Sequence, residues 1–439
     1  MELIINPPAE EWEKLCSRPL FDNAKLEKDV KSIMEAVRQG GDRVLREYTS
    51  RFDGVDIEHL RVPPEKLAQA GSHLDPRLKE AIGMAVKNIE AFHAAQKPAG
   101  VDVTTMPGVD CSLRYLPIEK VGLYIPGGTA PLFSTVLMLG IPAKIAGCRE
   151  VVLCTPPEQS GEIHPAILYA ASQASITSVY TAGGAQAIAA MAWGSETIPR
   201  VDKIFGPGNQ WVTMAKQIAA SSGIAIDLPA GPSEVAVVAD KSAPPQFIAA
   251  DLLSQAEHGA DSQVLLLTTD QEIIEPVKIE IERLLNRLPR RDITAAALKF
   301  CKMIVFQDYD VLMDFVNAYA PEHLIIATTN YKKLSTMVLN AGSVFLGNFT
   351  PESAGDYASG TNHTLPTNGF ARAWSGVGTD AFMKRITFQE VSGEGLQAIG
   401  PMVEFMAQAE NLEAHRQAVK VRLDYLINSK NSSWDQSIH

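Results

Sequence analysis

The chain has 439 residues, of which 46% are hydrophobic, and its formal net charge is −12 at pH 7. This length and apolar content suffice for about three domains with cores of their own. Phosphate contacts need clustered lysine and arginine, so the negative charge and the lack of a basic run argue against a nucleic-acid or anionic-membrane partner. The sequence shows neither a signal peptide nor an apolar stretch long enough to span a bilayer, and we therefore expect a soluble cytoplasmic protein.

The five cysteines are odd in number and contain no Cys-x-x-Cys pair. We therefore expect neither a disulfide framework nor a zinc site made of cysteines. Cys154 ends an apolar run that is typical of a buried parallel strand, which favours a role as a small core residue over one as a nucleophile.

The first quarter of the chain, up to about residue 110, is predicted to be mostly helical. Apolar residues recur at helical spacing from Leu26 to Tyr48 and again from Leu78 to Phe92. The histidines of this part are isolated in the sequence, and we expect them to be ordinary surface or core residues.

From Val121 onward, short apolar strands alternate with helical segments in two successive series. The first series has strands at 121–125, 150–154, 178–181 and 203–205, with helices near 132–145 and 165–174 and others starting at 185 and 209. The second has strands at 234–239, 263–267, 302–306, 324–327 and 342–346, with helices ending near 261 and lying near 273–285 and 311–318. Such alternation is typical of βαβ units, so we predict two open parallel-sheet α/β domains, each an incomplete Rossmann-like fold, side by side.

Joins rich in glycine and proline, at 124–128 and 228–233, lie at the two ends of the first series. This indicates that the first α/β domain is inserted into the second and flexes against it. The cleft between two such domains is the expected position of a functional site.

Three glycine-containing turns, at 125–131, 182–186 and 205–209, follow predicted strands and precede helices. Their backbone N–H groups and the adjoining helix dipoles suit a phosphate group. None is a dinucleotide fingerprint, because Trp211 stands where the third glycine after Gly206 and Gly208 would be. Tight βα turns without a ligand are the alternative interpretation.

The stretch 251–261 is predicted to be the end of a helix that stops at Gly259. It places Asp251, Gln255 and His258 at i, i+4 and i+7 along one edge of the helix. A carboxamide oxygen and an imidazole nitrogen can share a metal such as zinc if other elements supply the remaining ligands. A polar helix end with a capping histidine is the alternative.

Glu322 and His323 directly precede the predicted strand at 324–327. An adjacent carboxylate and imidazole suit general acid–base catalysis near neutral pH, although such a dipeptide is also common on protein surfaces. The long polar loop at 348–368 follows, and loops of this length are usually functional or disordered. Asp356 and His363 are its candidate metal ligands or substrate contacts.

The remainder is predicted to form one strand and two helices, at 382–390, 394–409 and 412–426. Asn411 is the expected N-cap of the last helix. Glu410 and His415 flank this cap, so both side chains can point to one spot beyond the start of the helix.

Separated stretches of the chain together resemble the histidinol dehydrogenase family over nearly the whole length. They are residues 122–128 with Ser134-Thr-Val, 206–209, 227–234, 255–258, 321–323, 355–363 and 410–415. The resemblance implies a homodimeric enzyme that depends on zinc and NAD and oxidises L-histidinol to L-histidine in two hydride transfers, the last steps of histidine biosynthesis. It also implies an N-terminal arm at 1–20, a zinc- and substrate-binding α/β domain at 21–123 and 234–377, an inserted NAD-binding α/β domain at 124–233, and a C-terminal helical domain at 378–439 that reaches the partner subunit.

The resemblance also assigns roles to individual residues. The zinc ligands would be Gln255, His258 and Asp356, completed by His415 of the partner subunit. Glu322 and His323 match the acid–base pair. The NAD contacts would be Tyr124, Gln186 and Asn209. The substrate contacts would be Ser233, Gln255, His258, His323, Asp356, His363, Glu410 and His415.

In this interpretation His323 removes the hydroxyl proton, Glu322 activates water for the bound aldehyde, and zinc orients the substrate. A dehydrogenase of the same family that acts on another polar alcohol is one alternative. A zinc-dependent hydrolase with Glu322 as its base is a second, although the glycine-rich turns would then have no role. A two-lobed binding protein is a third, although the acid–base pair would then have no role.

Overall fold

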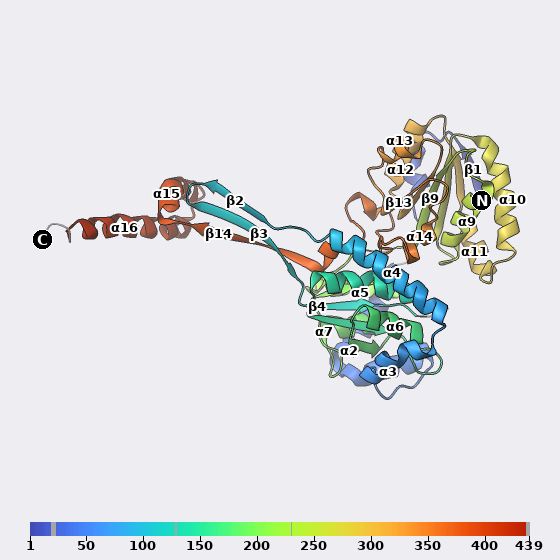
Figure 1. Cartoon of the computed structure of the whole chain (residues 1–439), viewed down its shortest axis with the longest axis horizontal. Helices are drawn as coiled ribbons and strands as arrows, with labels where there is room; N and C mark the ends of the chain where they lie inside the picture. Colours follow the sequence, from blue (N-terminus) through green and yellow to red (C-terminus); the bar gives the residue numbers. More distant parts are fainter. Residues whose placement is uncertain (19–22, 128–129, 230, 436–439) are drawn as a thin grey trace. The chain divides into compact units, whose positions relative to one another are not determined.

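The computed structural model describes residues 1–18, 23–127, 130–229 and 231–435 of the chain. Its contacts separate two units (Figure 1). Unit 1 comprises Met1–Lys97 and Ile118–Phe382, and unit 2 comprises Pro98–Pro117 and Met383–His439. Among the helices described, none combines the length and the apolar character needed to cross a membrane.

Unit 1 contains a six-stranded parallel sheet with the strand order β1-β11-β10-β9-β12-β13. The strands are β1 (Glu2–Ile5), β11 (Lys302–Val305), β10 (Gln263–Thr268), β9 (Glu234–Ala239), β12 (His323–Ala327) and β13 (Ser343–Leu346). The helices that follow them are α9 (Pro245–Ala256), α10 (Ile274–Leu285), α11 (Arg291–Ala297), α12 (Tyr309–Tyr319), α13 (Tyr331–Ser335) and α14 (Glu352–Tyr357). The short helix α1 (Trp12–Leu15) follows β1.

Alternating side chains of the central strands form two cores, one on each face of this sheet. In β9, Val235 and Val237 pack with α9 and α10, whereas Ala236 and Val238 pack with α12. A parallel strand that is covered on both faces has no polar side, which explains why its sequence is continuously apolar.

Unit 1 also contains a five-stranded parallel sheet with the order β6-β5-β4-β7-β8. Its strands are β6 (Ser178–Thr181), β5 (Glu150–Thr155), β4 (Lys120–Tyr124), β7 (Lys203–Phe205) and β8 (Ala225–Ile226). The helices associated with it are α5 (Phe133–Ala146), α6 (Pro165–Gln173), α7 (Gly184–Trp193) and α8 (Gln210–Ser221), together with α2 (Asn23–Tyr48), α3 (Pro64–Gln69) and α4 (Pro76–Ala95). Helix α2 packs on α7 and α8 in one apolar core.

Unit 2 is an antiparallel sheet with a helix pair. The strands are β14 (Met383–Val391), β3 (Val109–Pro117) and β2 (Val101–Met106), in this order across the sheet. The helices α15 (Gly393–Ala409) and α16 (Glu413–Asp435) pack on each other.

The remaining turns of unit 1 are a π-helical turn at Thr49–Asp53 and 3₁₀ turns at Ala9–Glu11, Ala70–His73, Gln271–Ile273, Leu298–Phe300, Phe370–Arg372 and Thr379–Phe382.

The predicted fold class is confirmed: both predicted series form open parallel sheets. The strands 178–181, 203–205 and 234–239 have the predicted bounds. All five cysteines are free, and Cys154 is fully buried in β5.

The prediction of a mostly helical first part is wrong at its two ends, where β1, β2 and β3 form. β1 pairs with β11, almost 300 residues later, and β3 pairs with β14 at a similar separation. Strand pairing over such distances leaves a weak local signal, because the partner supplies the hydrogen bonds and the packing.

Two predicted helix boundaries are also wrong. Helix α9 ends at Ala256, so Gly259 and His258 lie beyond the helix. Asn411 does not cap α16. It has φ 58° and donates its N–H to Gln408 O, 3.0 Å away, so it ends α15 in the left-handed conformation that asparagine tolerates better than most residues.

The predicted division into four domains remains a prediction, since the contacts define two units with other boundaries. Residues 98–117 belong to the same unit as the C-terminal segment. Helix α2 packs on helices of the five-stranded sheet rather than on the six-stranded one.

Candidate active site

Glu322 and His323 lie, buried, where α12 turns into β12. The turn between them and the helix is made by Ala320, which is fully buried and has φ 52°, an uncommon conformation for a residue other than glycine. His323 is the first residue of β12, with β9 and β13 on either side. The pair therefore lies at the amino ends of the parallel strands, opposite the edge where open α/β sheets usually bind ligands.

The main chain of Glu234 orients both side chains. Its N–H donates to Glu322 Oε2 at 2.8 Å, and its carbonyl oxygen lies 3.2 Å from His323 Nδ1. A proton on Nδ1 that is donated to this carbonyl leaves the lone pair on Nε2. Within the described part of the chain, His323 Nε2 is buried without a hydrogen-bond partner, so it is free to accept a proton from a substrate.

Acidic side chains surround this imidazole. Its Nε2 is 3.9 Å from Asp356 Oδ1, and its Nδ1 is 3.6 Å from Glu322 Oε2. Burial acts to lower the pKa of His323, but the negative charges of Glu322, Glu352 and Asp356 raise it to about 10. Without a further cation, the site therefore favours the imidazolium form.

His258, Glu352 and Asp356 form a cluster in which the three ligand atoms all lie within 4.8 Å of one another. Glu352 and Asp356 are one turn apart on α14, and His258 lies two residues beyond the end of α9. Burial raises the pKa of Glu352 to about 8, even though His323 acts to lower it. One imidazole nitrogen and two carboxylates this close together fit a single divalent cation such as Zn²⁺.

Gln255 is buried between this cluster and the acid–base pair. Both atoms of its amide are satisfied when the nitrogen faces the Glu352 carboxylate, 3.1 Å from Oε2, and the oxygen accepts from Glu234 N at 2.9 Å. A role as a metal ligand requires the oxygen, so the metal-ligand assignment of Gln255 remains a prediction.

His363 lies in the predicted polar loop, which is more ordered than expected because it contains α14. Its Nδ1 is 3.1 Å from Asp356 O, and its Nε2 is 3.1 Å from Thr135 Oγ1 on α5. Burial lowers the pKa of His363. Ser233 directly precedes β9, and its carbonyl accepts from Gln263 N at 2.9 Å.

A separate cavity of about 1300 Å³ lies beside the five-stranded sheet. Tyr124, Gln186 and Asn209, the three predicted NAD contacts, all line it. They come from the ends of β4 and the starts of α7 and α8, so this cavity lies at the carboxyl ends of its strands, the usual place for a nucleotide.

Local contacts fix two of these side chains, those of Tyr124 and Asn209. The hydroxyl oxygen of Tyr124 accepts from Gly184 N at 3.0 Å, and burial raises the pKa of Tyr124 to about 12. Asn209 caps α8 by accepting from Trp211 N and Val212 N at 3.0 and 3.2 Å. At Gly206, φ is 130° and a Cβ atom would overlap Tyr124 O, so this turn requires glycine.

Comparison with known proteins identifies the family. The family model for histidinol dehydrogenase matches residues 16–423. The chain belongs to the histidinol dehydrogenase family. Histidinol dehydrogenase from Bacteroides thetaiotaomicron is 55% identical over 97% of this chain and 100% of its own, and that from Salmonella typhimurium is 51% identical over 95% and 96%. The crystal structure of histidinol dehydrogenase from Elizabethkingia anophelis superposes with a TM-score of 0.94 at 54% identity, covering 97% of this chain and 98% of its own.

Most residues that the histidinol dehydrogenase resemblance assigned to zinc, substrate and acid–base catalysis come together in unit 1. They are Ser233, Gln255, His258, Glu322, His323, Asp356 and His363. Glu410 and His415 are exposed residues of unit 2, and their assignments remain predictions.

The sequence analysis missed two features of the site. Glu352 completes the cluster of possible metal ligands. Its spacing of four residues from Asp356 on a helix was a signal that could have revealed it. The buried ion pair between Arg18 and Glu234 was not predicted, and a separation of 216 residues leaves no local signal.

Replacement of Asp53, which lines the same cavity as Tyr124, Gln186 and Asn209, should change how stability depends on pH. Its Oδ2 atom is buried without a partner in the described structure, and burial raises its pKa to about 6. The folded state thus binds the proton more tightly than the unfolded chain, and the stability that this provides at low pH is lost as pH rises through about 6. Asp53→Asn should raise the free energy of unfolding by about 1 kcal/mol at pH 8 and leave it unchanged near pH 4.

Urea denaturation at both pH values measures this effect. The exposed residue Asp56 provides the matched control, since Asp56→Asn should have little effect at either pH. An equal change for Asp53→Asn at pH 4 and pH 8 would contradict the prediction.

Proposed function

We propose that this chain oxidises L-histidinol to L-histidine in two successive hydride transfers to NAD, through a bound histidinaldehyde. The observation that carries the proposal is the buried Glu322–His323 pair next to the cluster of His258, Glu352 and Asp356. It is supported by the names of the relatives, which are histidinol dehydrogenases of 50% identity or more.

The donor set is consistent with a zinc ion as resident metal. His258 and Asp356 would bind it together with Gln255 of the same chain, and His415 of the partner subunit is the fourth predicted ligand. Glu352 lies close enough to contribute. Zinc, when bound, supplies a Lewis acid that holds the amine and imidazole nitrogens of histidinol. Its charge would also offset the carboxylates that raise the pKa of His323, which favours the neutral imidazole that a base requires.

Proton transfers are assigned to the acid–base pair. His323 Nε2, whose lone pair is free, takes the proton of the substrate hydroxyl in the first oxidation. Glu322 then takes a proton from the water that adds to the aldehyde. His323, once its first proton has left to solvent, takes the hydroxyl proton of the hydrate in the second oxidation. NAD, when bound, accepts one hydride in each oxidation, and Tyr124, Gln186 and Asn209 would hold it in the cavity that they line.

Unit 2 supports a homodimer. Helices α15 and α16 expose large apolar side chains, among them Phe405, Met406 and Tyr425, with 74%, 64% and 72% of their surface accessible. An apolar surface of this kind is typical of a protein contact. We assign it to a second copy of the chain, because His415, predicted to complete the zinc site from across the dimer, lies in the first turn of α16.

The decisive experiment mixes the purified zinc-loaded protein with NAD and L-histidinol and measures NADH and histidine together. Two NADH per histidine are expected. A hydrolase or a binding protein would form no NADH. Absence of NADH with every polar amino alcohol tested would therefore overturn the proposal. If NADH formed only with another alcohol, the chain would be a dehydrogenase of different substrate specificity.

Loss of one metal ligand should remove both metal and activity. His258→Ala should reduce zinc content, measured by mass spectrometry, and lower kcat by at least about 100-fold, because it removes an imidazole ligand that the remaining donors do not replace. His59→Ala is the control, since the His59 side chain is 79% exposed. Zinc and activity that persist in His258→Ala would refute the ligand assignment.

Glu322→Gln should separate the two oxidations. The amide retains the acceptor for Glu234 N but cannot take a proton from water, so oxidation of added histidinaldehyde should slow by about 100-fold or more, and formation of the first NADH should slow less. Single-turnover measurements of NADH with each substrate test this. Aldehyde oxidation at the wild-type rate would exclude Glu322 as the base.

A further inference from the structure

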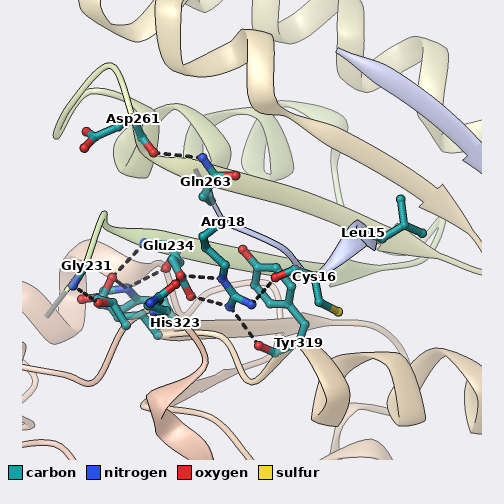
Figure 2. Close-up of polar contacts among 12 residues, drawn as sticks. Leu15, Cys16, Arg18, Gly231, Glu234, Asp261, Gln263, Tyr319 and His323 are labelled. Atoms are coloured by element: carbon teal, nitrogen blue, oxygen red, sulfur yellow. Dashed lines mark hydrogen bonds and ion pairs between the residues drawn. The ribbon is translucent and has the colours of Figure 1, made fainter. Parts of the chain in front are cut away.

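A buried ion pair, which has no role in the catalytic assignment, lies next to Glu322 and His323. Arg18 binds Glu234 through two parallel contacts, Nε to Oε1 and Nη2 to Oε2, both 2.9 Å (Figure 2). The two side chains are only 6% and 0% exposed. Such a two-pronged contact defines the orientation of the carboxylate as well as its distance.

Arg18 is itself held on its other sides. Its Nη1 donates to Cys16 O at 2.6 Å, its Nη2 also donates to Tyr319 O at 2.9 Å, and the guanidinium lies 3.8 Å above the centre of the Tyr319 ring (Figure 2). The segment that carries Arg18 is anchored by β1 on β11 and by Lys302 Nζ, which donates to Leu15 O at 3.0 Å. The guanidinium therefore has little freedom to move.

Glu234 connects this anchor with the reacting groups. Its carboxylate accepts from Arg18 and, at 2.8 Å, from Asn368 N, whereas its main chain contacts Glu322 Oε2 and His323 Nδ1. Figure 2 shows the guanidinium on one side of Glu234 and the His323 imidazole on the other. A shift of the Glu234 backbone would weaken the contacts of Glu322 and His323 at the same time.

Stability alone is a weak explanation for this arrangement. Burying two opposite charges costs desolvation that their attraction often only offsets, and an apolar pair of similar size is often as stable. What an apolar pair cannot provide is a directional contact that holds the Glu234 side chain, and with it the start of β9, against the N-terminal segment.

We propose that Arg18 is a positioning residue for catalysis: through Glu234 it holds Glu322 and His323 in the geometry that proton transfer requires. This inference rests on the proposed function, because it assumes that the two residues act as the acid–base pair. It assigns a role to the N-terminal segment, which contributes none of the predicted ligands.

The test compares single and double variants of the zinc-loaded enzyme. Arg18→Met should lower kcat per folded molecule by about 10- to 100-fold, whereas the KM values for histidinol and NAD should stay within about threefold, because substrate contacts persist while the base is displaced. Arg18→Lys retains the charge without the fork and should recover only part of kcat. Arg372→Met is the matched control. Arg18 and Arg372 both line one surface pocket, but Arg372 donates to Ala318 O rather than to Glu234.

The double variant Arg18→Met/Glu234→Gln separates positioning from stability and keeps the test decisive if Arg18→Met folds poorly. With neither charge present, thermal stability should return toward that of the wild type while kcat remains low. Recovery of both stability and kcat in the double variant would overturn the inference, as would a kcat of Arg18→Met within twofold of the wild type.

Failure of the proposed function gives a different result. In that case the wild-type protein itself forms no NADH from histidinol. Failure of this inference alone leaves an active wild-type enzyme whose kcat does not depend on the Arg18–Glu234 pair.

Discussion

Compensation of buried negative charge is the constraint on which the site depends. Glu234, Glu322, Glu352 and Asp356 lie within one small region, and buried carboxylates are stable only when they are paired, protonated or bound to a cation. Arg18 balances Glu234, and His323 can balance one more. Burial raises the pKa of Glu352, and the neighbouring carboxylates raise it further. This uncompensated negative charge is the physical reason to expect a divalent cation here.

The candidate sites of the two sheets in unit 1 lie at opposite ends of their strands. The cavity assigned to NAD lies at the carboxyl ends of the five-stranded sheet, where strands end in glycine turns that precede helices. The acid–base pair lies at the amino ends of β9 and β12, where the end of α9 and the helix α14 supply polar side chains. The segment that carries His363 also contacts α5. His363 is hydrogen-bonded to Thr135, and Asn362 donates to Met138 O at 2.6 Å. A rule that places sites at carboxyl ends thus finds the cavity that we propose for NAD and misses the pair that we propose for acid–base catalysis.

The comparison of prediction and structure shows where local sequence is informative. Strands such as 234–239 were predicted with their bounds because burial on both faces leaves a continuous apolar run. The predicted end of α9 is wrong because Gly259 is a typical helix stop in sequence, whereas the helix itself ends at Ala256. Asn411 was assigned to the wrong helix because asparagine favours both an N-cap and a left-handed end, and only the backbone distinguishes them.

The sequence by itself determined the fold class and the membership of the two parallel sheets apart from β1 and β8, and its resemblance to a family named candidate residues for the site. The reason is that apolar periodicity and short polar motifs are local properties of the chain. Tertiary structure alone decided that His258 meets Glu352 and Asp356, that Arg18 neutralises Glu234, and that the Glu234 main chain orients His323. These contacts join segments up to 216 residues apart, and they follow from strand order and burial, which no local pattern encodes.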